Sequence, residues 1–349
     1  MNKSDMINVP SKNSVHKAGS ILRKDDVSYE ELEQAINTLS CWRRLHSYPI
    51  NTFQAYLRLK VKRSDYSSPI IAQRLKRLPS IIQKLRRYPH MGLETMQDIG
   101  GIRVILKDLS EVYNLHSALS IARFKHIPIL PTNDYIKKPK KDGYRSLHQV
   151  YKYVNSSHPE LNVLHIEIQI RTRLQHAWAT AVETLGIVEK SSFKTGEGEE
   201  PFKRFFKLSS ALFSMDEKQP VVEEYQKYPR SQIISELQDL EKQLQITSKL
   251  QGLALSARQI ERIGSDGFGY HLLLLDTSKN KTSILNFSRK QLDWAERIYS
   301  EQEQRYKNNS DVSIVLIAAN NIREIKKAYP NYFLDTNDFI KNLNRMMNE

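Results

Sequence analysis

The sequence contains a single cysteine, Cys41, among 349 residues, and it has no apolar run long enough for a signal peptide or a membrane-spanning helix. One cysteine cannot form an intramolecular disulfide or a cysteine-rich zinc site, so both structural staples are excluded. The length corresponds to about two domains, which is enough chain to bury a core without them. We therefore expect a soluble, cytoplasmic protein with no structural zinc and no membrane partner.

Negative charge is also scarce, because 53 Lys and Arg residues face 39 Asp and Glu residues, for a net charge of +14. The excess is concentrated between Tyr56 and Arg87, where ten basic residues accompany one acid, Asp65. Such a balance favours a polyanionic partner such as a nucleic acid, a nucleotide or an acidic protein, and charge alone does not choose among them.

Apolar spacing predicts helices in the first part of the chain. Residues 32–39 carry apolar side chains at helical intervals, whereas 45–55, with Pro49, resemble a turn. A second helical face runs over 75–85. Pro79 interrupts that face, so we expect two helices there, the second beginning near Pro79.

Two strands are predicted further along, at 101–106 and 164–172. Apolar and polar residues alternate in the second, so a half-buried strand would present one polar face, which is a candidate site. That face carries His165, Glu167, Gln169 and Arg171. A capping-box pattern at Thr172 and Gln175 then predicts a helix that ends at Gly186.

The last part of the chain has a different texture. Helical patterns continue to about Ile263, after a polar break at 194–201. Beyond Gly269 we expect three short strands and three helices, which predicts a small α+β domain. The strands are expected at 270–275, 282–287 and 312–318, and the helices from Arg289, at 322–328 and at 338–346. We place the two domains at 1–265 and 266–349.

Four blocks of sequence occur in the order and style of one family. They are QRLKRLPSIIQKLRR (73–87), MQDIGGIRVIL (96–106), YIKKPKKDGYRSLH (135–148) and IEIQIRTRLQHAWATAVE (166–183). Together they resemble the RelA/SpoT nucleotide pyrophosphokinase domain, over roughly residues 15–210, and most closely its toxic small synthetases. The HD hydrolase pair of long family members is missing from the sequence. The resemblance implies an α+β fold with a mixed, nucleotidyltransferase-like sheet flanked by helices. It also implies transfer of the β,γ-pyrophosphoryl group of ATP to a ribose 3′-hydroxyl.

The resemblance assigns a metal, Mg²⁺, to Asp98 and Glu167. Asp98 precedes the first predicted strand and Glu167 lies on the polar face of the second, so neighbouring strands would let both carboxylates hold one ion on the ATP phosphates. In the family, Glu167 is also placed to accept the proton of the attacking hydroxyl. Taken singly, Asp98 could be a turn residue and Glu167 a solvated outward residue.

The same resemblance assigns ATP binding to a basic pattern, R-x-K-x-x-x-S-I-x-x-K. Arginine can stack on adenine while lysines meet phosphate oxygens as point charges. A solvated basic helix would explain the charges equally well but not the serine spacing. The residues are Arg74, Lys76, Ser80 and Lys84, with Gln169 and Arg171 as further candidates that could orient Glu167 or touch the triphosphate.

The loop 137–145 corresponds to the family's acceptor-binding loop. Its tyrosine stacks on the acceptor base in the family, and Tyr144 occupies that catalytic position here. Lys140, Arg145 and His148 could then contact acceptor phosphates or ribose. A tyrosine beside Gly143 could otherwise be an ordinary surface aromatic in a turn.

The identity of the acceptor is left open by the residues of the site. One alternative is the 3′-terminal adenosine of tRNA, whose modification blocks translation, and a second is GDP or GTP in a small alarmone synthetase that makes (p)ppGpp. The basic surface favours the longer polyanion. A third alternative is a non-catalytic RNA-binding or sensing module.

The last residues add a further resemblance. The segment KKAYPNYFLDT (326–336) and the elements before it resemble the C-terminal region of CapRel fused toxin–antitoxins, a module similar to a zinc finger without the metal. In that group a Y-x-x-Y motif, here Tyr329 and Tyr332, covers the ATP site until a phage protein binds. The resemblance therefore implies autoinhibition, a phage trigger as partner and a role in antiviral defence. Alternatively, both tyrosines belong to the core of the small domain.

Overall fold

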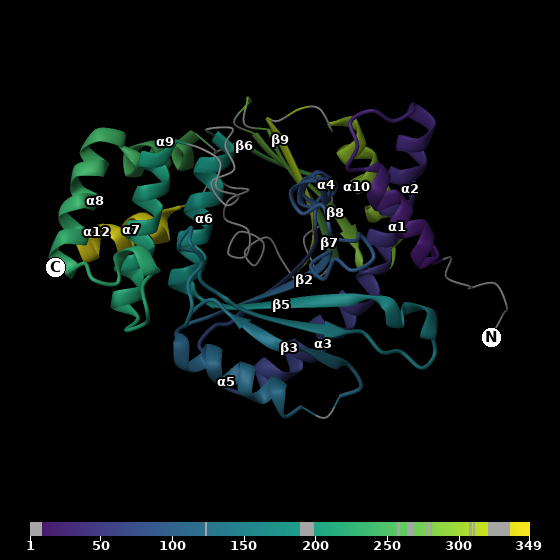
Figure 1. The fold of residues 1–349 in the computed structure, drawn as a ribbon, viewed down its shortest axis with the longest axis horizontal. Helices are drawn as coiled ribbons and strands as arrows, with labels where there is room; N and C mark the ends of the chain where they lie inside the picture. Colours follow the sequence, from purple (N-terminus) through teal and green to yellow (C-terminus); the bar gives the residue numbers. More distant parts are fainter. Residues whose placement is uncertain are drawn as a thin grey trace.

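The computed structural model describes residues 9–122, 124–188, 199–256, 259–263, 269–276, 278–279, 281–306, 309, 311–319 and 336–349. They form two β-sheets, helices that cover them, and a separate helical layer (Figure 1). The predicted α+β class with a mixed sheet is confirmed. Within these residues, no helix is both long and apolar enough to span a membrane.

The first sheet has the strand order β1-β2-β5-β4-β3, and β2 and β5 are its parallel pair. Its strands are β1 (Ile70–Leu75), β2 (Gly100–Leu106), β3 (Ile127–Asp134), β4 (Leu147–Lys152) and β5 (His165–Thr172). The β2–β5 pairing places Gly101 opposite Glu167, so the two strands predicted from sequence are neighbours.

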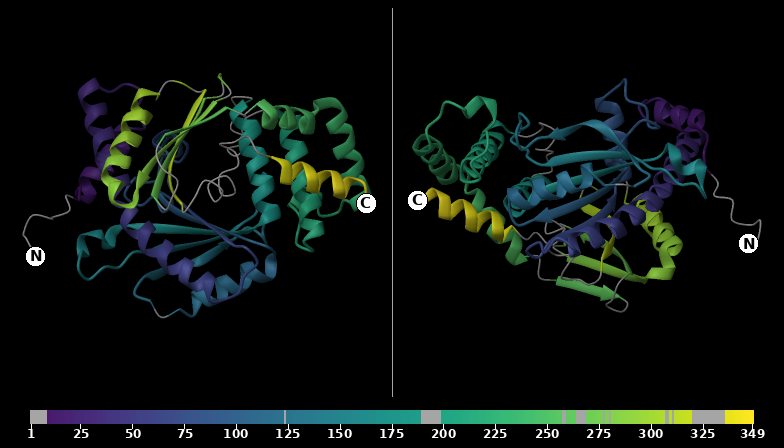
Figure 2. Two further views of the ribbon diagram at one scale, coloured as in Figure 1. Left: turned by 180° about the vertical axis from the view of Figure 1, so that it is seen from behind. Right: turned by 90° about the horizontal axis from the view of Figure 1, so that it is seen from below.

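Helices on one face of this sheet bury its apolar side. Figure 2 shows α3 (Ser47–Lys62) and α5 (Leu109–Ser120) beneath the sheet, while α1 (Lys12–Ile21) and α2 (Tyr29–Leu45) lie beside it. The alternate residues Ile166, Ile168 and Ile170 of β5 are fully buried in this core. The polar residues between them therefore point to the opposite face of the sheet.

Two local predictions are wrong in this region. Residues 47–62 form helix α3 rather than a turn at 45–55, because Pro49 lies in the first turn, where its missing N–H costs nothing. Only one helix forms over 75–85 instead of two, because Leu75 belongs to strand β1, which pairs with β2 from Ile70 opposite Ile105 to Leu75 opposite Gly100. The helix of this segment, α4 (Leu78–Arg87), begins beside Pro79, as predicted.

A helical layer packs at the end of β5. It contains α6 (Arg173–Val188), α7 (Glu200–Asp216), the short 3₁₀ turn η3 (Glu223–Tyr225), α8 (Arg230–Leu244), α9 (Ile246–Ser256) and α12 (Asn337–Met347). A second short 3₁₀ turn, η1 (Pro159–Val163), precedes β5. Phe205, Phe213 and Phe339 are fully buried within this layer. The C-terminal helix α12 is therefore part of its core, as the yellow helix in Figure 2 shows.

The second sheet has the order β6-β8-β7-β9 and packs against α10 (Leu292–Arg305), which follows the turn η4 (Arg289–Gln291). Its strands are β6 (Gln259–Ile263), β7 (Gly269–Asp276), β8 (Lys281–Ser288) and β9 (Val312–Ala319). The three strands predicted at 270–275, 282–287 and 312–318 are confirmed as β7, β8 and β9, and the helix predicted from Arg289 is confirmed as well. The expected helix up to Ile263 is wrong at its end, because β6 pairs with β8.

The expected domain boundary at 265/266 would divide the second sheet between β6 and β7. Helix α12 does not pack with this sheet's core but belongs to the helical layer that contains α6 and α7. The last part of the chain is thus not one separate unit. The expected helix at 322–328 and the motif tyrosines Tyr329 and Tyr332 lie outside the described residues, and the expected zinc-finger likeness stays a prediction.

Candidate active site

A cleft of about 640 Å³ opens on the polar face of the first sheet, between the strand ends, α4 and α7. It brings together most of the site residues predicted from sequence: Arg74, Lys76, Lys84, Asp98, Lys140, Tyr144, His148, Glu167, Gln169 and Arg171. Among the described residues that line it, nine are Lys or Arg and four are Asp or Glu. The cleft therefore suits a polyanionic ligand.

Asp98 is held by two lysines. It lies in the turn before β2, with Lys76 Nζ 2.7 Å and Lys84 Nζ 2.9 Å from its Oδ2. Burial alone would raise the pKa of Asp98, but Lys76 and Lys84 hold that pKa well below its usual range. Its other oxygen, Oδ1, is buried and has no hydrogen-bond partner among the residues that the structure describes.

Glu167 belongs to a chain of hydrogen bonds. Its Oε1 lies 2.9 Å from His148 Nδ1, and its Oε2 accepts from Gln169 Nε2 at 2.7 Å. On the other side of the imidazole, His148 Nε2 lies 2.9 Å from the hydroxyl of Tyr144. The chain joins strand β5, strand β4 and the loop before β4.

The charges along this chain follow from burial and pairing. Burial by itself would lower the pKa of His148, but Tyr144 and Glu167 raise it to about 9, so the imidazole is protonated at neutral pH. Burial would raise the pKa of Glu167, yet His148 lowers it, so the carboxylate is ionised. His148 therefore donates to Glu167 and cannot accept a proton from a substrate.

The two carboxylates meet the requirements of a magnesium site that also uses substrate phosphates. Asp98 and Glu167 both line the cleft and the smaller hollow that adjoins it, and their charges repel each other. The unsatisfied Oδ1 of Asp98 is a hard oxygen ligand of the kind that Mg²⁺ prefers. Within the described residues there is no group of three or more His, Cys, Asp or Glu that could hold an ion without a substrate. The residues present thus fit Mg²⁺ bound through one or two carboxylates and phosphate oxygens.

Arginines from three strands crowd the same end of the cleft. Arg74 lies near the end of β1, Arg103 in β2 and Arg171 in β5. Burial, together with the nearby Arg103 and Arg74, lowers the pKa of Arg171 to about 9. Cations that destabilise one another in this way are stabilised by a multiply charged anion. Arg103 was not predicted, although its place between the buried Ile102 and Val104 marks it as a residue of the polar face.

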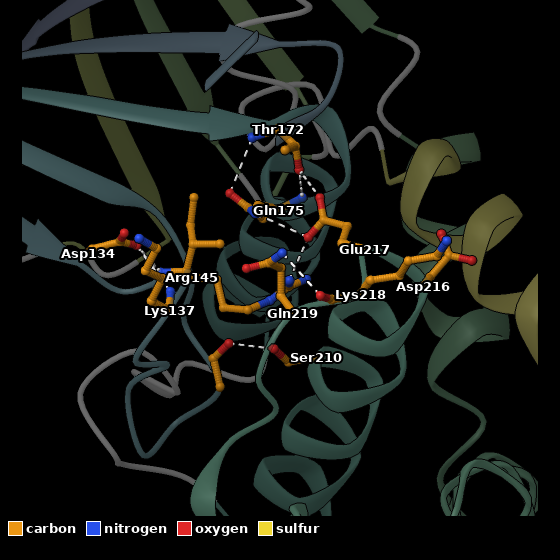
Figure 3. Close-up of polar contacts among 12 residues, drawn as sticks. Asp134, Lys137, Arg145, Thr172, Gln175, Ser210, Asp216, Glu217, Lys218 and Gln219 are labelled. Carbon is orange, nitrogen blue, oxygen red and sulfur yellow. Dashed lines mark hydrogen bonds and ion pairs between the residues drawn. The ribbon is translucent and has the colours of Figure 1, made fainter. Parts of the chain in front are cut away.

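Two predicted residues do not reach the cleft. Ser80 is half-buried in the first turn of α4 and is not among the lining residues. Arg145 is 2% exposed, and its Nη1 lies 2.5 Å from Glu217 Oε2 (Figure 3). The expectation that Arg145 contacts the acceptor is therefore not supported, because its guanidinium is turned into the protein and held by a carboxylate.

In the loop that carries Tyr144, the ammonium group of Lys140 lies over two aromatic rings. Lys140 Nζ lies 4.3 Å from the ring centre of Tyr135 and 5.1 Å from that of Tyr144. The ring of Tyr135 also meets His148 edge-on, with the centroids 5.2 Å apart. Sequence reasoning missed Tyr135, although it opens the block 135–148. It also missed two lysines of α7, Lys203 and Lys207, which line the cleft from a distant part of the chain.

Part of this chain is similar to known proteins. Residues 73–197 match the family described as "Region found in RelA / SpoT proteins". Two proteins of Bacillus subtilis (strain 168) are similar: "GTP pyrophosphokinase YjbM", 38% identical over 126 residues, and "GTP pyrophosphokinase YwaC", 33% identical over 112 residues. These matches cover 35% and 31% of this chain and 58% and 52% of the relatives, so the chain spans about half the length of the curated relatives it matches.

Among solved structures, the small alarmone synthetase 1 of Bacillus subtilis bound to its product pppGpp is 26% identical, with a TM-score of 0.42. That match covers 50% of this chain and 90% of the solved one. The segment matched by the family, 73–197, holds Asp98, Glu167, His148 and the arginines of the cleft. Residues 73–197 are therefore similar to the RelA/SpoT region, and most residues that line the cleft belong to this segment.

Proposed function

We propose that the protein is a pyrophosphokinase that transfers the β,γ-pyrophosphoryl group of ATP to the 3′-hydroxyl of an acceptor nucleotide. The observation that carries the proposal is the pair of carboxylates, Asp98 and Glu167, in a cleft where basic side chains outnumber acidic ones. Phosphoryl transfer depends mainly on positioning and on neutralising charge, and this cleft is equipped for both. The relatives named GTP pyrophosphokinase and the RelA/SpoT region support the same reaction.

The triphosphate of ATP would lie at the arginine end of the cleft. Arg74, Arg103 and Arg171 bring fixed positive charge to it, and Lys76 and Lys84 can exchange Asp98 for phosphate oxygens. When bound, Mg²⁺ would neutralise charge on the transferred group, and Asp98 and Glu167 are the residues that would hold it.

Glu167 is the group that would take the proton from the attacking hydroxyl. It is ionised, and each carboxylate oxygen keeps a lone pair beyond those used by His148 and Gln169. Protonated His148 orients the carboxylate and prevents it from turning away. Tyr144 lies one hydrogen bond further along this chain of contacts and also lines the cleft, so its ring would stack on the base of the acceptor.

For the acceptor, we favour the 3′ end of tRNA, so that transfer would block translation. Support comes from the net charge of +14 and the excess of basic side chains in the cleft, which suit a long polyanion. The second candidate is GDP or GTP, as in an alarmone synthetase that makes (p)ppGpp, and the names of the similar proteins favour it.

Control by the C-terminal part is a separate proposal. The tail with Tyr329 and Tyr332 would cover the ATP site until a phage protein binds it, shifting a closed state to an open one. Support comes from α10, whose Glu303 forms a buried ion pair with Arg43 of α2. Truncation at residue 265 would also remove α12 from the core of the helical layer, so point variants are the better test.

The deciding experiment incubates the full chain, and its Tyr332→Ala variant, with γ-labelled ATP and Mg²⁺. Deacylated tRNA is supplied in one tube and GDP in another. Label on RNA supports the first candidate, label on guanosine supports the second, and no label from either chain would refute the pyrophosphokinase and favour a non-catalytic binding module. If Tyr332→Ala is no faster than the wild type without a phage protein, autoinhibition by this motif is refuted.

A further inference from the structure

Helix α7 forms a wall of the cleft, although it lies outside the RelA/SpoT region that ends at residue 197. Four of its residues line the cleft: Glu200, Lys203, Phe206 and Lys207. Their spacing of three and four puts them on one helical face. The rest of the helix is packed, with Phe205, Leu208 and Leu212 fully buried.

The face of α7 that meets the cleft is attached to the acceptor loop at two points. Ser210 Oγ donates to the carbonyl of Gly143 at 2.5 Å, and Glu217, which caps the end of α7, holds Arg145 (Figure 3). Gly143 has φ +90°, and a Cβ there would lie 3.0 Å from Ser210 Cβ and 3.4 Å from Lys207 Cα. Glycine thus allows the loop to touch α7 closely.

Glu217 ties this contact to the rest of the site. Besides Arg145, it accepts from Thr172 Oγ1 at 2.5 Å and from Gln175 Nε2 at 3.1 Å, at the junction of β5 and α6 (Figure 3). The loop, β5 and α7 therefore share one carboxylate, whose side chain is only 10% exposed. Because these contacts hold α7 against the loop, Lys203 and Lys207 keep a fixed position relative to Lys140, and the three lysines can contact one ligand together.

The lysines of α7 have partners that they can exchange. Lys203 Nζ lies 3.0 Å from Glu200 and Lys207 Nζ lies 2.9 Å from Glu224, but the side chains of these acids are 79% and 50% exposed. Such exposed ion pairs contribute little to stability. A phosphate entering the cleft competes with them at little cost.

We propose that Lys203 and Lys207, with Lys140 and Lys141 of the loop, form an anion subsite for the phosphates of the acceptor nucleotide. The inference rests on the proposed pyrophosphokinase function. The subsite lies at the end of the cleft where α7 meets the loop at Gly143, whereas Arg74, Lys76 and Arg103 gather around Asp98 in the adjoining hollow. Lysines act as point charges, so the subsite accepts either a diphosphate or the backbone phosphates of an RNA end.

The test compares Lys203→Gln and Lys207→Gln in the full chain with Lys242→Gln, a matched control on α8 whose lysine side chain is 79% exposed and outside the cleft lining. KM for the acceptor, KM for ATP and kcat are measured with Mg²⁺ and with GDP or deacylated tRNA. We expect each cleft variant to raise the acceptor KM about tenfold, as loss of a hydrogen bond to a charged group would, with ATP KM unchanged. Lys207→Arg should restore the acceptor KM, which separates loss of charge from misfolding.

The salt dependence of binding identifies the source of the phosphates. For an RNA end, each lysine removed should reduce the slope of log K against log salt by about 0.7. For a diphosphate, the KM effect should appear with GDP and be missing with tRNA. Acceptor KM values equal to those of Lys242→Gln for both acceptors would overturn the subsite.

Failure of the proposed function gives a different result. If the wild type transfers no label to either acceptor, titration of the full chain with GDP and with deacylated tRNA replaces the kinetic measurement. Weaker binding by the cleft variants than by Lys242→Gln would then support the subsite without the reaction. Equal binding by all variants would overturn it.

Discussion

Glu303 connects the C-terminal sheet to the side of the cleft where we propose that ATP binds, and its replacement by glutamine is the most informative single change away from the reacting groups. Its Oε2 lies 2.5 Å from Arg43 Nη1, with the two side chains 4% and 3% exposed. Its Oε1 accepts from the N–H of Leu78, the first residue of α4, at 3.3 Å. Arg43 also lies 4.6 Å from the ring centre of Tyr299.

The expected loss can be worked out from this burial. Glu303→Gln leaves the Arg43 guanidinium charged and without its carboxylate, and breaking a buried pair from one side costs about 3–5 kcal/mol. Weaker binding of the α4 N–H adds to this cost. Because α4 carries Lys84 and Arg43 also approaches the carbonyl of Lys76, we expect weaker ATP binding as well as lower stability.

The assay is thermal and urea unfolding of the full chain together with titration by a non-hydrolysable ATP analogue. Glu301→Gln, an exposed position on the same helix, is the control. The double variant Arg43→Met with Glu303→Leu should recover most of the stability, since an apolar pair can replace a buried ion pair. If Glu303→Gln unfolds like the control and binds the analogue as tightly as the wild type, the coupling between α10 and the ATP side is refuted.

Two further predictions concern buried carboxylates. Burial raises the pKa of Glu296 to about 7, so its protonated form stabilises the folded chain at acid pH and this contribution is lost as the pH rises through 7. The free energy of unfolding of Glu296→Gln, relative to that of the wild type, should therefore increase by about 3 kcal/mol between pH 5 and pH 9. Unfolding of both proteins is measured at a series of pH values. If the two curves of unfolding free energy against pH are parallel, this prediction is contradicted. Glu217→Gln should loosen the acceptor loop and raise acceptor KM more than ATP KM. Equal changes in both would show that Glu217 acts only on global folding.

Local patterns were enough to predict the strand that forms the floor of the site. The alternation in β5 predicted its polar face, and Thr172 with Gln175 predicted the start of α6, because both signals depend on residues close in sequence. The helix expected before Pro79 is absent because Leu75, which shares the apolar spacing of 75–85, belongs to β1, and the pairing of β1 with β2 is a long-range contact. Pro49 led to the wrong prediction of a turn, because a proline is compatible with a helix when it lies in the first turn, as it does in α3.

The residues of the site likewise fall into those that sequence motifs predict and those that only long-range contacts bring into place. The motif carboxylates could be found in the sequence, and the structure brings them into one cleft. The motif could not show that Arg145 turns inward, because its partner Glu217 lies 72 residues away. Lys203 and Lys207 were also out of reach, because only the packing of α7 on Gly143 brings them to the cleft.

The central claim is that Asp98 and Glu167 together enable pyrophosphoryl transfer. It is tested most directly by the transfer rate of Glu167→Gln beside Asp98→Asn, in full chains shown to be folded, with γ-labelled ATP, Mg²⁺ and the acceptor that the wild type uses. We expect the transfer rate to fall at least about a hundredfold in each variant, as for other charges that act on a transition state. Transfer at the wild-type rate by either variant would contradict it.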